Sequence, residues 1–148
     1  MRSRAFLVVI ALAATAAACG GRITPVVDDL TFAPQKLSAG YGFIGGMHVA
    51  MVDPTTDGVR RALRIDAKGL DGSYSVAAGT VTITLTEARS DGTTVTYSTV
   101  SGTVSIQGTD ARGSSERVQV DLLVADPAES WHELHLAGTW VAPLDYYG

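Results

Sequence analysis

Three histidines are the side chains of this chain best suited to acid–base or metal chemistry. His132 and His135 stand three positions apart in the segment HELH, whereas the zinc-peptidase pattern needs two histidines four apart on a helix. On a strand, alternation puts His132 and His135 on opposite faces, where they cannot share a metal ion. We therefore expect neither a metal nor a cofactor, with Glu133 and His135 facing solvent. His48 lies on another predicted strand, and no spacing relates it to the other two histidines.

Catalysis would require a histidine within hydrogen-bond reach of both an acid and a nucleophile. No serine stands in a Gly-x-Ser-x-Gly turn, and we expect no enzymatic activity. Exposed aromatic side chains stack on sugar rings or insert into partners, and Trp131, Tyr146 and Tyr147 are candidates for exposure. The candidate ligand contacts are thus Trp131, His132, His135 and His48.

Charged side chains cluster in two turns and on one strand. Asp53 and Asp57 share a turn, and so do Asp66 and Asp71. Calcium binds several carboxylates in a flexible loop, but aspartate beside glycine is also ordinary turn chemistry.

The only basic cluster is Arg60, Arg61 and Arg64, with Arg60 and Arg64 on one face and Arg61 on the other. Charged side chains protect an exposed strand edge from aggregation. The alternative is a contact with an anion or a glycan.

Length and charge limit the classes of function. The chain has 148 residues, 46% of them hydrophobic, and a net charge of −4. This length suits one folded domain. The acidic charge excludes a nucleic-acid partner, which would require a concentrated basic face.

The N-terminus has the form of a secretory signal peptide. Arg2 and Arg4 precede the apolar segment 5–12, and small residues then lead to Cys19, the single cysteine. A membrane-spanning helix needs about 20 apolar residues, and Gly20 and Gly21 come too early for one.

The cleavage region Ala16-Ala17-Ala18-Cys19 resembles the lipobox of bacterial lipoproteins. In that family the cysteine thiol receives a diacylglycerol, and a dedicated peptidase cuts before the cysteine. Position −3 is usually Leu there and is Ala16 here, and the ordinary signal peptidase could cut the same bond. The resemblance implies a membrane partner through a lipid on Cys19. Because Gly20 rather than Asp follows, it implies the outer membrane if the host is Gram-negative; the alternative is plain secretion.

Hydrophobic residues alternate with a period of two from Tyr41 onward, which indicates strands. Turn signals every eight to twelve residues predict an all-β domain of about eight strands, either an antiparallel β-sandwich or a closed meander barrel. Val100 breaks the alternation, which predicts a bulge or a strand end. The residues predicted to face inward are Val81, Ile83, Leu85, Val95, Tyr97, Val104, Ile106, Val118, Val120, Leu122, Val124, Leu134, Leu136 and Trp140.

Short segments of the C-terminal half, SGTVSI, RVQVDL and LAGTWVAP, resemble a group of small bacterial lipoproteins with no agreed activity. The resemblance covers about Tyr41 to Pro143. Members of the group often end on a cysteine, whereas this chain ends on Leu144-Asp145-Tyr146-Tyr147-Gly148, so the corresponding disulfide is absent.

These observations predict a signal peptide over 1–18, a lipid-anchored tether over 19–40 and an all-β domain over 41–148. The alternative for the middle segment is the N-terminal edge of the fold. We expect a non-enzymatic structural or binding lipoprotein of the cell envelope, with an unknown envelope protein or glycan as partner. The alternative is a carrier that holds a small apolar ligand in a β-barrel cavity.

Overall fold

Strands make up most of the described residues in the computed structural model, which describes residues 24–42, 45–54 and 58–145. The prediction of an all-β domain is therefore confirmed. The elements are β1 (Val26–Asp29), β2 (Lys36–Tyr41), β3 (Met47–Pro54), β4 (Arg60–Ala67), β5 (Gly72–Ser75), β6 (Val81–Ala88), β7 (Thr94–Gly108), β8 (Ser115–Ala125), the short 3₁₀ helix η1 (Pro127–Glu129) and β9 (His132–Pro143).

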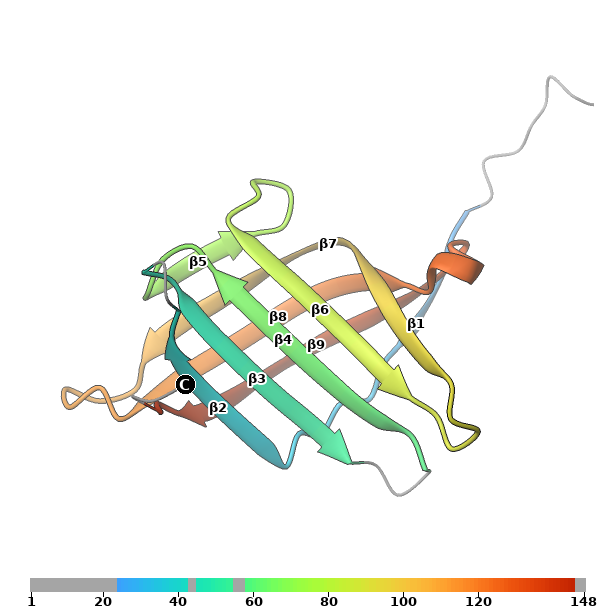
Figure 1. The fold of residues 1–148 in the computed structure, drawn as a ribbon. Coiled ribbons are helices and arrows are strands. Elements are labelled where there is room, and N and C mark those ends of the chain that lie inside the picture. The colour runs from blue at the N-terminus through green and yellow to red at the C-terminus, as the bar shows by residue number, and fades with distance from the viewer. Residues whose placement is uncertain (1–23, 43–44, 55–57, 146–148) are drawn as a thin grey trace, which may run out of the picture.

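One curled sheet carries all these strands in the order β1-β9-β8-β7-β6-β4-β3-β2, with β5 paired to β7. It forms a half-barrel whose two parts are joined by β7 (Figure 1). The first part of β7 pairs with β6, and the rest pairs with β8. The register shifts between Thr99 and Ser101. Val100 is therefore at a bulge, one of the two predicted outcomes, and a bulge bends a strand and increases its twist.

The sheet is mixed, which corrects the expectation of a purely antiparallel one. Strand β1 pairs with β9 in parallel, with Val26 opposite His132 and Asp29 opposite His135. Tight turns force neighbouring strands to run antiparallel, but no tight turn joins β1 to β9. Strand β5 also leaves the simple meander, because β4 pairs directly with β6.

Segment 19–40 was expected to be either a tether or the N-terminal edge of the fold. Its described part contributes two strands to the sheet. β1 lies against β9, and β2 lies against β3. Between them Phe32 is 8% exposed and meets the ring of Trp140 edge-on, with centroids 5.6 Å apart. A Cβ on Gly138 would lie 2.4 Å from that Trp140 ring. Gly138 therefore makes room for Trp140. Among the described residues, the first strand begins at Val26 and not at residue 41.

The core lies on the concave side of the sheet. Every residue predicted to face inward is either buried or partly buried and packed against buried neighbours. Strands β3 and β4 add an apolar group that sequence analysis did not assign to the core: Met47, Val49, Met51, Leu63 and Ile65. Burial of such side chains contributes about 1.5–3 kcal/mol each.

Glu87 is a buried carboxylate on the concave side, 6% exposed, beside the first residues of β7. Its Oε2 accepts from Arg61 Nε at 3.0 Å, and its Oε1 accepts from Arg89 Nε at 2.9 Å. Tyr97 adds a hydroxyl donor at 3.4 Å. Arg61 therefore does point away from Arg60 and Arg64, but into a buried ion pair rather than to solvent.

Candidate functional site

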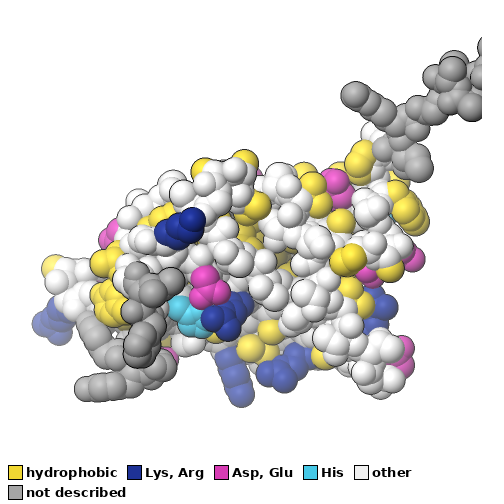
Figure 2. Space-filling model, turned by 45° about the horizontal axis from the view of Figure 1, so that its top comes forward, with side chains coloured by type: hydrophobic (Ala, Val, Ile, Leu, Met, Phe, Trp, Pro, Cys, Tyr) yellow, Lys and Arg dark blue, Asp and Glu magenta, His cyan; other side chains and the backbone are white. Residues whose placement is uncertain are grey.

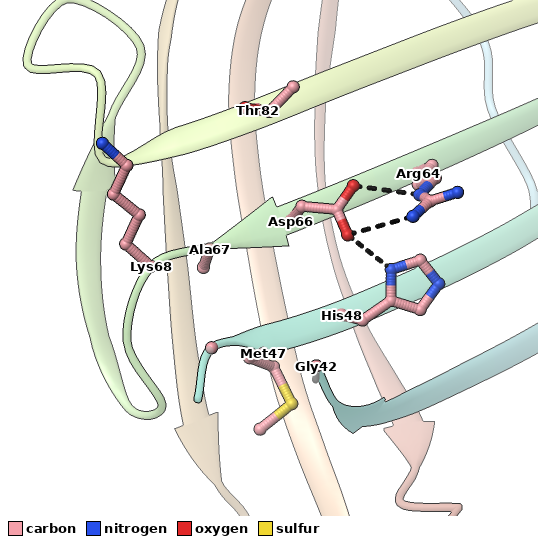
Figure 3. A pocket seen from close by; sticks show the side chains of 9 residues that line it. Gly42, Met47, His48, Arg64, Asp66, Ala67, Lys68 and Thr82 are labelled. Carbon is pink, nitrogen blue, oxygen red and sulfur yellow. Dashed lines mark hydrogen bonds and ion pairs between the residues drawn. The ribbon is translucent and has the colours of Figure 1, made fainter. Parts of the chain in front are cut away.

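A hollow lies where β3 begins and β4 ends, on the convex side of the sheet (Figure 3). Its volume is about 640 Å³, within the ~300–1,000 Å³ typical of small-molecule sites. Figure 2 shows a histidine, an acidic and a basic side chain side by side on this surface. The lining residues are Gly42, Gly46, Met47, His48, Arg64, Asp66, Ala67, Lys68 and Thr82.

Strand register brings the polar side chains of this hollow together. His48 on β3 lies directly opposite Asp66 on β4, and Arg64 precedes Asp66 by two residues on the same face. His48 Nδ1 lies 2.7 Å from Asp66 Oδ1, and Arg64 Nε donates to Asp66 Oδ2 at 2.9 Å. Asp66 thus holds both neighbours in place, as Figure 3 shows.

Two opposing effects act on the carboxyl group of Asp66. Partial desolvation raises its pKa, but the hydrogen bonds from Arg64 and His48 together outweigh desolvation and leave the pKa below its usual value. Asp66 is therefore ionised at neutral pH, and its charge is matched by Arg64.

Lys68 gives the hollow a further positive charge. It follows β4 directly, and its side chain extends away from the group of His48, Arg64 and Asp66 (Figure 3). Within the described residues its ammonium group makes no ion pair. With Arg64 matched by Asp66, the lining carries a net positive charge beside a surface that is mainly apolar. Such a surface suits a small ligand with an anionic group.

The two C-terminal histidines lie elsewhere, on β9, and each binds an aspartate of β1. His132 Nε2 lies 2.7 Å from Asp28 Oδ2. His135 lies between two carboxylates, with Nδ1 3.1 Å from Asp29 and Nε2 2.8 Å from Asp121 of β8. The hydrogen bonds to Asp121 and Asp29 raise the pKa of His135. These contacts attach β1 to the sheet.

The structure does not gather the predicted ligand contacts into one site. His48 is on β3, whereas Trp131, His132 and His135 are at β9, which is not a neighbour of β3 in the sheet. Trp131 is 52% exposed and stacks on His132, with centroids 5.7 Å apart. Cys19, Tyr146 and Tyr147 lie outside the described residues.

The acidic turns considered for calcium are separated as well. Asp53 is 3% exposed and accepts a hydrogen bond from the amide of Ala33 at 2.9 Å. Asp57 lies outside the described residues, and Asp66 belongs to the hollow. Throughout the described ranges, no group of three or more His, Cys, Asp or Glu side chains is arranged to hold a metal ion.

Sequence reasoning named His48 and Arg64 separately but did not connect them. The signal that connects them is the turn predicted from the sequence at Asp53 and Asp57, since antiparallel pairing of β3 and β4 on either side of it places His48 opposite Asp66. Lys68 lies beyond the strand end and carried no such signal.

Comparison with known proteins gives this chain no relative. No family model, no curated protein and no solved structure matches it. Within the described residues, no helix is long and apolar enough to span a membrane.

Proposed function

We propose that this protein is a lipid-anchored lipoprotein of the bacterial cell envelope whose β domain binds a small ligand or a group on an envelope partner, without catalysis. The lipobox-like sequence at Cys19 supports the anchor. Two or three acyl chains hold a protein stably at a membrane without a spanning helix. The cell envelope, and the outer membrane in a Gram-negative host, is the expected location.

The hollow beside His48 is the observation that supports binding. It combines the positive charges of Arg64 and Lys68, the first of them matched by Asp66, with a lining surface that is mainly apolar. We infer a ligand with a carboxylate, phosphate or sulfate group next to a small apolar part, because an anion would pair with Lys68 and with the outer edge of Arg64.

Binding is favoured over catalysis by what surrounds His48. A hydrolase would need an acid and a nucleophile within reach of the histidine. Asp66 supplies an acid, but it is shared with Arg64. Among the described lining residues the only hydroxyl belongs to Thr82, and no serine or cysteine is present. His48 is therefore proposed as a hydrogen-bonding contact for a ligand.

We further propose that the curled sheet is a barrel with an interior filled by side chains, and not a sandwich of two sheets. An isolated parallel bridge joins Ala39 to Leu144, and the amide of Asp145 donates to the carbonyl of Ala39 at 2.7 Å. These contacts bring β2 beside the chain that follows β9. Of the residues predicted to face inward, only Val104 and Val120 border either of the hollows described. A filled interior disfavours the alternative of an apolar-ligand carrier.

Membrane fractionation of the wild type and of Cys19→Ser tests the anchor, together with the intact mass of the mature chain. We expect wild type in the membrane fraction with an added lipid mass, and the variant in the soluble fraction. If both are soluble and carry no lipid, the anchor is refuted, and Cys19 would then be examined for an intermolecular disulfide.

Binding of an anilinonaphthalene sulfonate dye tests the hollow, since the dye joins an anionic group to apolar rings. We expect Lys68→Ala to weaken binding about threefold to tenfold, as loss of one solvent-exposed hydrogen bond with a net value of about 1 kcal/mol does. Arg64→Ala should weaken it more, because Asp66 then repels the dye. Arg117→Ala removes an exposed arginine from β8 and serves as the matched control. Equal affinity in all four proteins would refute this site.

A further inference from the structure

Glu116 is a buried carboxylate for which the described structure provides no partner at one oxygen. It lies on β8 opposite Gly108 of β7, and it is 4% exposed. Its Oε2 is fully buried and accepts no hydrogen bond. Leaving a buried acceptor unpaired costs about 1–3 kcal/mol, and more when the group is charged. An ionised Glu116 would therefore need a bound ion or water at this oxygen, and a neutral Glu116 would need a proton there.

A second carboxylate borders the same space. Asp71 comes from the turn before β5, and its Oδ2 accepts from the amide of Gly108 at 3.3 Å. A Cβ built on Gly108 would lie 3.7 Å from Asp71 Oδ2 and 4.0 Å from Glu116 Oε2. Gly108 has no side chain and is itself exposed, so it leaves space beside Asp71 Oδ2 and Glu116 Oε2.

No basic side chain of the described residues pairs with these two carboxylates. Burial raises the pKa of Glu116, and the negative charge of Asp71, a hydrogen bond with Asp71 and the charge of Asp110 raise it further. Burial and the charge of Asp71 also raise the pKa of Tyr74. No lysine, arginine or histidine of the described ranges forms an ion pair with Asp71, Asp110 or Glu116. The local field therefore favours a cation.

We propose that Glu116 and Asp71 together bind a calcium ion beside Gly108. Only oxygen donors are present, which suits calcium or magnesium and not the transition metals that prefer histidine or cysteine. Two carboxylates, with no third acidic or histidine side chain arranged around the same point, leave the remaining positions to backbone carbonyls and water. Calcium accepts such an irregular set of six to eight oxygens, whereas magnesium requires near-octahedral geometry.

The competing arrangement is a proton in place of the ion. In that case Glu116 is neutral and its protonated oxygen donates to Asp71. Both arrangements satisfy the buried oxygen, but only one depends on calcium. The ion site is independent of the hollow at His48 and of the anchor at Cys19.

Calcium titration of the full-length purified protein distinguishes the two arrangements. Isothermal titration calorimetry is expected to give a dissociation constant of about 10⁻⁴–10⁻³ M, the range of extracellular calcium modules. Glu116→Gln keeps the shape of the side chain and should weaken binding at least about tenfold, as should Asp71→Asn at the exposed carboxylate. Glu129→Gln changes an exposed carboxylate on η1 and should leave the affinity unchanged.

Terbium luminescence gives a second readout that does not depend on heat. Terbium replaces calcium in oxygen sites. The hydroxyl of Tyr74 lies near Gly69 and Gly72, on either side of Asp71, so the tyrosine ring can sensitise terbium luminescence. Luminescence that calcium displaces in wild type but not in Asp71→Asn would support the site. Absence of calcium binding at about 10 mM, far above the expected range, would overturn the proposal. Unchanged affinity in both Glu116→Gln and Asp71→Asn would overturn it equally.

Discussion

Two buried glutamates lie beside opposite ends of the long strand β7, one on β6 and one on β8. Their surroundings differ completely. Glu87 lies opposite Val95, near the start of β7, and Glu116 lies opposite Gly108, at its end. Both are almost fully buried, at 6% and 4% exposure. Glu87 accepts hydrogen bonds from two arginines and a tyrosine. Glu116 has two acidic neighbours and a buried oxygen without a partner.

The difference shows that burial of a charge has two distinct meanings in this fold. At Glu87 the chain itself supplies the opposite charge, so the group is part of the structure. At Glu116 the chain supplies none, and the group must take up a proton or an ion from solution. A buried carboxylate therefore indicates a ligand only where its neighbours leave it unpaired.

The first prediction concerns Glu87 and its arginine partners, where we expect the largest change in stability. Glu87→Gln removes the negative charge and leaves Arg61, which is 18% exposed in its side chain, without a counter-ion. Breaking a buried pair by removing one partner costs about 3–5 kcal/mol. We expect the free energy of unfolding in urea to fall by about 3 kcal/mol, the lower end of that range.

Glu129→Gln is the control, since it removes an exposed charge from η1 and should change stability by less than about 0.5 kcal/mol. A loss below about 1 kcal/mol for Glu87→Gln would mean that the arginines contribute little. The two ends of β7 would then not differ in the way described.

The second prediction is that the corresponding substitution at Glu116 raises the free energy of unfolding, whereas Glu87→Gln lowers it. In EDTA, Glu116→Gln removes the unpaired charge and gives the side chain an amide donor that can reach Asp71. We expect the free energy of unfolding to rise by about 1 kcal/mol, which is the net value of one hydrogen bond. If the variant is less stable than wild type by an amount similar to Glu87→Gln, the carboxylate of Glu116 is stabilised by a partner within the protein, and the two glutamates do not differ.

The third prediction concerns pH. A carboxyl group whose pKa is raised by folding binds its proton more tightly in the folded state, so stability falls as pH rises from the usual value of 4.5 through the raised pKa of Glu116. Asp66 acts in the opposite direction at lower pH. Its lowered pKa adds stability above 3.8 that is lost as pH falls through the folded value.

Urea unfolding between pH 4 and 8 measures the effect of Glu116, with EDTA in one series and calcium in the other. Calcium should flatten the decline, because the ion replaces the proton. Glu116→Gln should flatten it in EDTA as well. A decline of the same size in wild type with calcium and in Glu116→Gln would assign it to another group.

The same contrast explains how much of the molecule could be predicted from its sequence. Alternation identified the inward side chains of β6 to β9 and the irregularity at Val100, because a strand's faces follow from local spacing. It also separated Arg61 from Arg64. It could not reveal that Arg61 meets Glu87, or that Asp71 meets Glu116, because these pairs depend on which distant strands become neighbours. The parallel pairing of β1 was missed for the same reason.

The last prediction concerns carboxylates that are exposed to solvent, in contrast to the two buried glutamates. Asp29 and Asp121 are exposed and hold His135 between β1 and β8. Their hydrogen bonds raise the pKa of His135 above 6.5. The imidazolium donates to both carboxylates, so attachment of β1 is strongest below pH 6.5 and weakens as pH rises through the raised pKa. Exposed pairs contribute little to global stability, so the effect should be local.

Amide hydrogen exchange at 26–29 measures this local effect, because β1 can detach without unfolding of the remaining sheet. After correction for the intrinsic pH dependence of exchange, we expect protection of these amides to fall as pH rises through the pKa of His135, while amides of β8 keep theirs. His135→Gln should abolish the pH dependence, and Glu133→Gln, on the same strand, should not. Equal losses of protection in β1 and β8 would mean that the exposed ion pairs of His135 stabilise the whole fold and not β1 alone.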